Sequence, residues 1–142
     1  MQGTRRLVAL TVSGALLLGA ACSDDDPASP SGPTVTQVAG TYRATTFTAT
    51  SALGSEEVLQ SGGSLTAVFN LDGSLTGHVV VPSESLDEDF SGEWKISDGE
   101  VEIEAVPTDI FVEDLKFTVV GSTLVADETL SGVRVQVTLT KQ

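Results

Sequence analysis

The stretch WKISDGEVEI, residues 94–103, decides the fold. Asp98-Gly99 is a favoured pair for a two-residue β-hairpin turn, because such a turn needs positive φ at both central positions. With this turn, apolar side chains collect on one face of the hairpin and charged side chains on the other, and a shift of one residue would exchange the faces. The expected pairs are Trp94 with Ile103 and Ile96 with Val101 on the apolar face, and Lys95 with Glu102 on the charged face.

Three further turn signals give the same separation of faces along the chain. Gly73 suits the left-handed position of a three-residue loop, Gly121-Ser122 suits a type II′ turn, and Ser131-Gly132 suits a two-residue turn. The apolar pairs that follow are Phe69 with Leu75, Leu65 with Val79, Ala67 with Gly77, Val119 with Leu124, Phe117 with Ala126, Leu124 with Leu139, Ala126 with Val137 and, after the Asp98-Gly99 turn, Gly92 with Ala105. We therefore expect eight strands, near residues 40–50, 64–70, 74–81, 89–96, 101–106, 114–120, 123–130 and 133–141.

Consecutive antiparallel strands with one apolar face predict an all-β fold, an eight-stranded antiparallel up-and-down β-barrel, because closure removes exposed strand edges. A two-sheet sandwich is the alternative, although the pattern supplies no crossing connections. Phe47 is out of phase with Tyr42 and Ala44, which indicates either a bulge in the first strand or a wrong register there. The small pairs Ala67–Gly77 and Gly92–Ala105 leave open whether the barrel contains a cavity or simply tapers.

The chain begins with a basic segment, an apolar run and a cysteine. Arg5 and Arg6 precede apolar residues 7–21, which are too few to span a bilayer and fit a secretory signal. The small residues before Cys22 resemble a bacterial lipoprotein signal, in which the cysteine is lipidated and becomes the first mature residue. Gly19 departs from the leucine usual at that position, and an ordinary signal peptide is the alternative. The single cysteine excludes an intramolecular disulfide.

We expect three regions: a lipoprotein signal peptide over residues 1–21, a flexible acidic and Pro/Ser-rich tether over 22–36, and the barrel domain over 37–142. The Ser-Asp-Asp-Asp run after Cys22 resembles outer-membrane sorting and surface-export signals, with a plain solvated linker as the alternative. The expected location is the bacterial cell envelope, lipid-anchored at the outer membrane. Without residues 1–21 the net charge changes from −13 to −15, which disfavours nucleic acid as a partner.

The barrel region resembles the lipocalin-like domains of bacterial lipoproteins. Gly40-Thr41-Tyr42 is similar to the family's Gly-x-Trp at the start of the first strand, with Tyr in place of Trp. The resemblance implies that Lys141, near the end of the last strand, packs over Tyr42 at the closed base of the barrel. The lengths of the connections predict an open mouth at the other end, because the tight turns after the second, fourth and sixth expected strands fall at the base and the three long connections, 51–63, 82–89 and 107–113, fall opposite. Lipocalins share this asymmetry, and the mouth would face away from the membrane because the tether enters at the base.

The three long connections at the predicted mouth carry acids and no Lys or Arg. These acids are Glu56, Glu57, Glu84, Asp87, Glu88, Asp89, Asp109, Glu113 and Asp114. Glu128 falls on the inward face near the mouth, where it would either orient a ligand or turn to water. With it, the candidate ligand-binding residues are Leu115, Val135, Phe90, Val81 and Leu65. A Ca²⁺ site in the ESLDED run is a further alternative, although a solvated acidic loop fits its spacing better.

Two functions fit this pattern. In the first, a membrane-anchored barrel binds a small apolar or amphipathic molecule at its acidic mouth. In the second, a solid barrel recruits a basic protein through its acidic loops. We expect no enzyme activity, no cofactor and no metal, because no Ser/His/Asp set, metal-ligand cluster or phosphate loop is evident; His78 is expected to be an outward-facing surface residue opposite Thr66.

Overall fold

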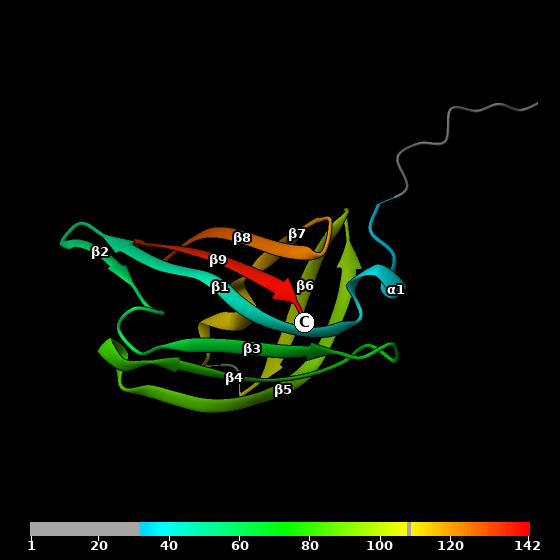
Figure 1. Ribbon diagram of the computed structural model, residues 1–142, viewed down its shortest axis with the longest axis horizontal. Coiled ribbons are helices and arrows are strands. Elements are labelled where there is room, and N and C mark those ends of the chain that lie inside the picture. The colour runs from blue at the N-terminus through cyan, green and yellow to red at the C-terminus, as the bar shows by residue number, and fades with distance from the viewer. Residues whose placement is uncertain (1–31, 108) are drawn as a thin grey trace, which may run out of the picture.

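The computed structural model describes residues 32–107 and 109–142, which form one nine-stranded antiparallel sheet. The sheet order is β2-β1-β3-β4-β5-β6-β7-β8-β9, and β1 also pairs with β9, so eight strands close into a barrel and β2 is an addition to it (Figure 1). The strands are β1 (Gly40–Ser51), β2 (Gly54–Glu57), β3 (Ser64–Phe69), β4 (Ser74–Val81), β5 (Leu86–Ser97), β6 (Glu100–Val106), β7 (Lys116–Val120), β8 (Thr123–Leu130) and β9 (Val133–Lys141). The helical turns are α1 (Val35–Val38), η1 (Pro82–Glu84) and η2 (Phe111–Asp114).

The predicted eight-stranded up-and-down barrel is confirmed, including most of its register. Asp98 and Gly99 both have positive φ, and Trp94 pairs with Ile103 across the turn. The other expected pairs are also present, except that the β7–β8 ladder ends at Thr118 and Val125, one pair short of Phe117 and Ala126. The fourth predicted strand, expected near residues 89–96, corresponds to β5 and begins earlier than expected, at Leu86.

A bulge in β1 explains the phase of Phe47. The pairing of β1 with β9 shifts between Ala44 and Thr46. Because of the extra residue, Phe47 points into the barrel together with Tyr42 and Ala44, and all three side chains are buried. Of the two alternatives, a bulge in the first strand or a wrong register, the bulge is therefore correct. It adds one residue to β1 and so changes which later residues of the strand point inward.

The two ends of the barrel differ. The base carries α1 and the turns after β3, β5 and β7, whereas the mouth carries β2, η1 and the turn between β8 and β9 (Figure 1). The base is closed by packing: Tyr42 and Phe69 meet edge to face at 5.4 Å, Phe69 and Trp94 at 5.6 Å, and Val38 of α1 is fully buried. The Trp94 indole N–H donates to the Asn70 carbonyl at 3.0 Å, which ties the β3–β4 turn to this cluster.

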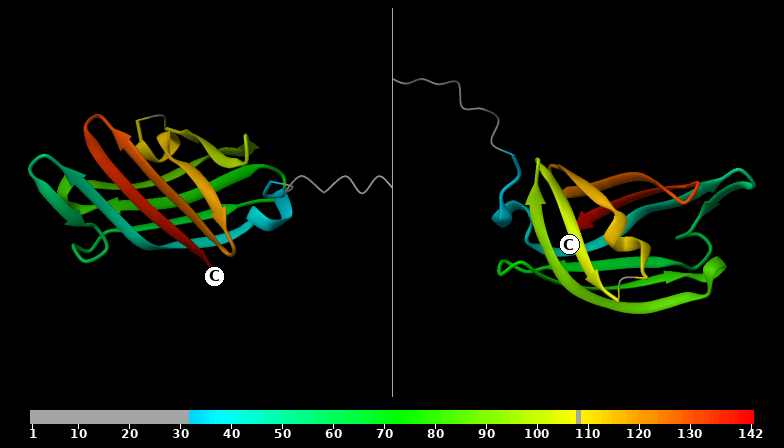
Figure 2. Two further views of the ribbon diagram at one scale, coloured as in Figure 1. Left: turned by 90° about the horizontal axis from the view of Figure 1, so that it is seen from above. Right: turned by 180° about the vertical axis from the view of Figure 1, so that it is seen from behind.

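The wall is interrupted between β6 and β7. These strands pair only over Glu100–Glu102 and Lys116–Thr118, and nearer the mouth η2 lies between them (Figure 2, right). Val112 of η2 and the adjacent Leu115 are almost fully buried. The helical turn therefore replaces part of the missing ladder with apolar contacts.

The small residues of the interior do not leave a void beside them. A Cβ on Gly77 would lie 2.2 Å from Phe90 Cζ, so the Phe90 ring occupies the space that a side chain at Gly77 would need. A Cβ on Gly92 would lie 1.9 Å from the Glu104 carbonyl oxygen, so this glycine permits close approach of β5 and β6. The sequence left open whether these small pairs border a cavity or simply fit the taper of the barrel. The atoms close to Gly77 and Gly92 show close packing rather than a cavity.

Candidate functional site

The candidate site is an apolar hollow at the mouth of the barrel, here called the mouth hollow. Its volume is about 270 Å³. Three walls form it: the bulged half of β1 with the residue after β2, the β4–η1–β5 connection, and the ends of β8 and β9 with η2. It is lined by Phe47, Ala49, Val58, Val81, Glu84, Leu86, Phe111, Leu130, Val133 and Val135.

The β1 bulge is the local cause of this lining. It brings Phe47 and Ala49 onto the inward face, where the Phe47 ring packs against Phe111 of η2 at 5.8 Å. The ladders continue the apolar surface, because Ala49 pairs with Val135. Phe111, Leu86 and Leu130 are only half-buried, so the apolar lining reaches solvent at the rim.

Glu84 is the one charged side chain among the described residues that line the mouth hollow. It ends η1, which begins at Pro82 and is terminated by Ser85 in the left-handed conformation at φ 54°. A second depression, the side groove, shares Ala49, Glu84 and Val133 with the hollow and has a volume of about 310 Å³. It extends to the fully exposed Leu53 at the β1–β2 turn. Glu84 thus stands where the apolar hollow meets a more polar groove.

The structure brings two of the six expected ligand-binding residues to the mouth hollow, Val81 and Val135. Leu65, Phe90 and Leu115 are core residues with at most 3% exposure, and they lie outside the hollow lining. Glu128 is half-buried, on the inward face opposite Val135, but it is not part of the lining either. The lining residues that sequence reasoning missed are Phe47, Ala49, Val58, Leu86, Phe111, Leu130 and Val133. The out-of-phase Phe47 was an available signal for the β1 residues alone.

The nine acids of the predicted mouth are distributed around the rim rather than gathered at one point. Glu56 and Glu57 lie on β2, and Glu84 ends η1. The acids on β5 are Asp87, Glu88 and Asp89. Glu113 and Asp114 belong to η2, and Asp109 precedes it. Glu57 accepts a hydrogen bond from the Thr48 hydroxyl at 2.9 Å. In the part of the chain that the structure describes, no three His, Cys, Asp or Glu side chains gather closely enough to hold a metal ion.

His78 lies opposite Thr66, as expected, but it also bridges two of these acids on the outer wall. Its Nε2 lies 3.2 Å from an Asp87 oxygen and its Nδ1 lies 2.8 Å from an Asp89 oxygen. The sequence held only part of this signal, because residues two apart on a strand share a face, whereas the pairing of His78 with Asp89 comes from the β4–β5 register in the structure. Asp87 and Asp89 are thereby directed toward the outer wall rather than the hollow.

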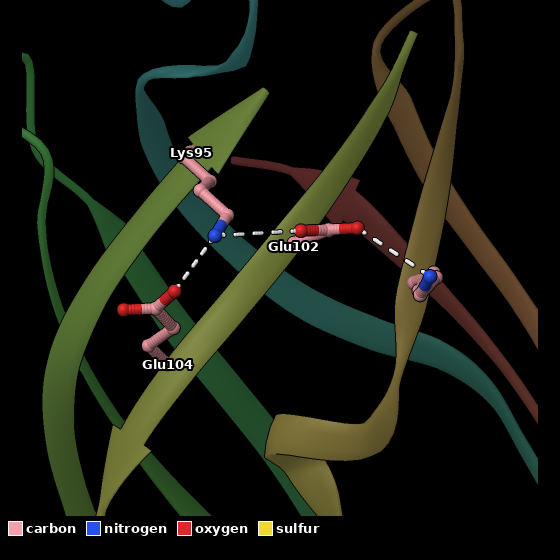
Figure 3. Close-up of polar contacts among 4 residues, drawn as sticks. Lys95, Glu102 and Glu104 are labelled. Atoms are coloured by element: carbon pink, nitrogen blue, oxygen red, sulfur yellow. Dashed lines mark hydrogen bonds and ion pairs between the residues drawn. The ribbon is translucent and has the colours of Figure 1, made fainter. Parts of the chain in front are cut away.

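The basic residues of the described chain are engaged elsewhere or lie near the base. Lys95 Nζ lies 2.8 Å from Glu104 and 3.7 Å from Glu102, and Lys116 lies 3.4 Å from Glu102 (Figure 3). The hydrogen bond with Glu104 raises the pKa of Lys95, and the same bond lowers the pKa of Glu104. These ion pairs are exposed and sit on the outer wall, so they stabilise the hairpin only weakly.

Arg134 is the basic residue closest in sequence to the β8–β9 turn at the mouth. Its Nε and Nη2 donate two hydrogen bonds to the carboxylate of Asp127, the first at 2.7 Å. The hydrogen bond from Arg134 lowers the pKa of Asp127, and Asp127 in turn raises the pKa of Arg134. This bidentate pair neutralises the guanidinium on the outer face of β8 and β9.

The structure brings Gly40, Tyr42 and Lys141 together at the base. Lys141 Nζ lies 5.9 Å from the centroid of the Tyr42 ring and donates to the Gln37 carbonyl at 3.2 Å. The Tyr42 hydroxyl donates to the Val38 carbonyl at 2.8 Å. A Cβ on Gly40 would lie 2.3 Å from Lys141 Cε, so the lysine stem covers this glycine. These contacts fasten α1 over the closed end of the barrel.

The predicted signal peptide and most of the predicted tether, with Cys22, lie outside the described residues. Across residues 32–107 and 109–142, no helix combines the length and the apolar character needed to cross a bilayer. No family model, curated protein or solved structure matches the chain.

Proposed function

We propose that this protein is a lipid-anchored envelope protein whose lipocalin-like barrel binds one small apolar or amphipathic molecule at its mouth. The mouth hollow is the observation that carries the proposal, because it is an apolar depression that opens to solvent at one end of an otherwise packed barrel. Binding sites are concave and mostly apolar, with few polar groups that orient the ligand. The mouth hollow, with Glu84 at its edge, matches this description.

The volume of the hollow limits what it can enclose. Ligand pockets usually measure roughly 300–1,000 Å³, and the mouth hollow, at about 270 Å³, is slightly smaller than this range. An apolar cavity of about 150 Å³ is enough for benzene. The hollow therefore suits one ring or one short acyl chain, and any polar part of the ligand would lie outside it, at the rim.

The arrangement of the barrel supports a membrane-tethered carrier. The described chain enters at the base through α1, so the mouth lies at the end remote from the predicted tether (Figure 2). A lipid on Cys22 would then hold the base toward the membrane and leave the mouth accessible.

Lipidation of Cys22 is tested by incorporation of radiolabelled palmitate. We expect the full chain to be labelled and to fractionate with membranes, and Cys22→Ser to lose both properties. Membrane fractionation without label would contradict lipidation.

Ligand binding is tested on the barrel domain, residues 32–142, which contains the whole sheet and core. It is secreted to the bacterial periplasm behind an ordinary signal peptide and studied by native mass spectrometry, followed by solvent extraction of any adduct. We expect a stoichiometric adduct, or uptake of one fluorescent lipophilic probe, that Ala49→Leu abolishes because the added side chain fills the hollow.

Ala52→Leu is the matched control, because it makes the same change at an exposed turn position that does not line the hollow. Equal binding by the unsubstituted domain and both variants would place any ligand elsewhere. A clean apo mass with no probe uptake would refute the carrier function and favour the second function, recruitment of a basic partner protein. The fully exposed Leu53, beside Glu56 on the mouth rim, is the observation that favours this second function.

A further inference from the structure

We infer that the mouth hollow selects an amphiphile with a cationic headgroup, such as an alkylammonium, and that Glu84 is the residue that sets this specificity. The inference rests on the proposed ligand binding and adds the chemistry of the headgroup. It follows from three features of the described residues: the position of the one charged side chain that lines the hollow, the positions of the basic side chains, and the small volume of the hollow.

The position of Glu84 is the first feature. It lines both the mouth hollow and the side groove, and its side chain is exposed. An acyl chain inserted among Phe47, Val81 and Val135 would leave its polar end at this boundary, because the hollow encloses only about 270 Å³. The first charge that the headgroup meets on the lining is therefore the Glu84 carboxylate.

The absence of a competing cation is the second feature. Of the five basic residues that the structure describes, none lines the mouth hollow or the side groove. Lys95 and Lys116 pair with glutamates of β6, Arg134 is held by Asp127, and Lys141 covers the base. Arg43 lies on the base-proximal half of β1, between Thr66 and Thr140. Glu84 is thus available to a cation from the ligand.

The electrostatic surroundings reinforce this preference. Glu56 lines the side groove together with Glu84, and Leu86 and Phe111 supply apolar surface on the other side. A charge pair beside an apolar wall interacts more strongly than one fully surrounded by water. An ammonium headgroup is attracted at this position, and a carboxylate headgroup is repelled by two acids.

Glu128 does not have the same role. It occupies the inward face of β8, and the sequence left two roles open for it, orientation of a ligand or exposure to water. The lining of the mouth hollow includes its neighbour Leu130 and its partner Val135, but not Glu128 itself. The headgroup contact is therefore expected at Glu84 of η1 rather than at Glu128 of β8.

The test compares three probes with the same eight-carbon chain: octylamine, octanol and octanoate. Their affinities for the barrel domain, residues 32–142, are measured at neutral pH by calorimetry and by displacement of a lipophilic fluorophore. At neutral pH the amine is cationic and the acid is anionic. We expect octylamine to bind about tenfold more tightly than octanoate, with octanol between them.

Two charge-matched variants identify the responsible residue. Glu84→Gln removes the acid at the hollow, whereas Asp98→Asn removes an exposed acid at the base, in a turn that Asn also suits. We expect Glu84→Gln to weaken octylamine binding by about three- to fivefold without weakening octanol binding, and Asp98→Asn to leave both unchanged. Circular dichroism establishes that both variants are folded.

The outcomes separate this inference from the function on which it rests. Equal binding of the three probes, or tighter binding of octanoate, would overturn the headgroup preference and leave the carrier function standing. An equal effect of Glu84→Gln and Asp98→Asn would overturn the role of Glu84, because the net charge of the molecule would then explain the preference. Failure of all three probes to bind would count against the carrier function itself.

Discussion

Gly77 shows how one missing side chain shapes the interior of this barrel. The Phe90 ring occupies the space beside it, and the Thr66 carbonyl oxygen would lie 2.4 Å from a Cβ at this position. The sequence indicated a small pair at Ala67 and Gly77 but not its purpose, because the direction of the Phe90 ring depends on how β4 and β5 twist. How side chains fill the interior depends on the three-dimensional arrangement of the strands. Because the Phe90 ring fills the space beside Gly77, the hollow is confined to the mouth.

We expect Gly77→Ala to destabilise the domain by about 1–3 kcal/mol, because the added methyl overpacks the core. Chemical denaturation followed by circular dichroism measures the effect. The double variant Gly77→Ala/Phe90→Leu should recover part of the loss, because leucine lacks the ring atom nearest to the new methyl, while the contact with the Thr66 carbonyl remains. A single variant as stable as the unsubstituted domain would show that Phe90 can move aside.

Tyr42 gives a pH-dependent prediction. Burial raises the pKa of its phenol, and the neutral hydroxyl donates to the Val38 carbonyl. The neutral form is therefore favoured in the folded state, so this stabilisation is complete below the unfolded phenol's pKa of about 10 and is lost as pH rises through the folded value. Since the chain has one tyrosine, tyrosinate absorbance during an alkaline titration reports Tyr42 alone. A midpoint equal to that of the denatured chain would contradict the raised pKa.

At the scale of elements, the sequence predicted strands well where alternating apolar residues and a turn signal occur together. The hairpins at Asp98-Gly99 and Gly121-Ser122 have both, and the pairs next to each turn are as expected, although the second ladder ends before Phe117 and Ala126. β2, with the sequence GSEE, has no apolar face; it forms because its backbone continues the hairpin with the end of β1. The mouth hollow was only partly predictable, since its lining depends on the β1 bulge, which the sequence indicated only as a break in phase at Phe47, and on η2, which has no periodic signal.

The element η2 should be the part of the wall that opens most readily. It occupies the gap where β6 and β7 share only three residue pairs, and apolar contacts of Val112 and Leu115 take the place of the ladder. We expect backbone amides of residues 109–115 to exchange hydrogen faster than those of the β1–β9 ladder.

Leu115→Ala should cost about 2–5 kcal/mol and increase this exchange, since the leucine is fully buried. Leu71→Ala, at an exposed turn, is the comparison that should change neither quantity by much. Equal exchange in residues 109–115 and in the β1–β9 ladder would show that η2 is as firmly held as the continuous wall.

At the scale of the whole molecule, negative charge greatly exceeds positive charge. The full chain has 20 acidic and 7 basic residues, and the ion pairs that the structure shows are on the surface. Self-repulsion of this kind destabilises the compact state. It acts over the whole fold, whereas each exposed ion pair contributes little.

We therefore expect added NaCl to raise the unfolding temperature of the barrel domain, because screening reduces the repulsion more than it weakens the few ion pairs. Calorimetry at low and at physiological ionic strength measures the effect. A lower unfolding temperature in salt would mean that the Lys95 and Arg134 pairs outweigh the repulsion.

The aromatic cluster at the base has a consequence for how this protein can be observed. Its single tryptophan, Trp94, and its single tyrosine, Tyr42, both contact Phe69 at the closed end. The proximity favours energy transfer from Tyr42 to Trp94, so the intrinsic emission comes mainly from the indole at the base. This emission will follow unfolding of the whole barrel but will barely respond to a molecule that enters the mouth. A tryptophan introduced at Phe111, on the lining of the mouth hollow, would supply the missing reporter, with Trp94 as the internal reference.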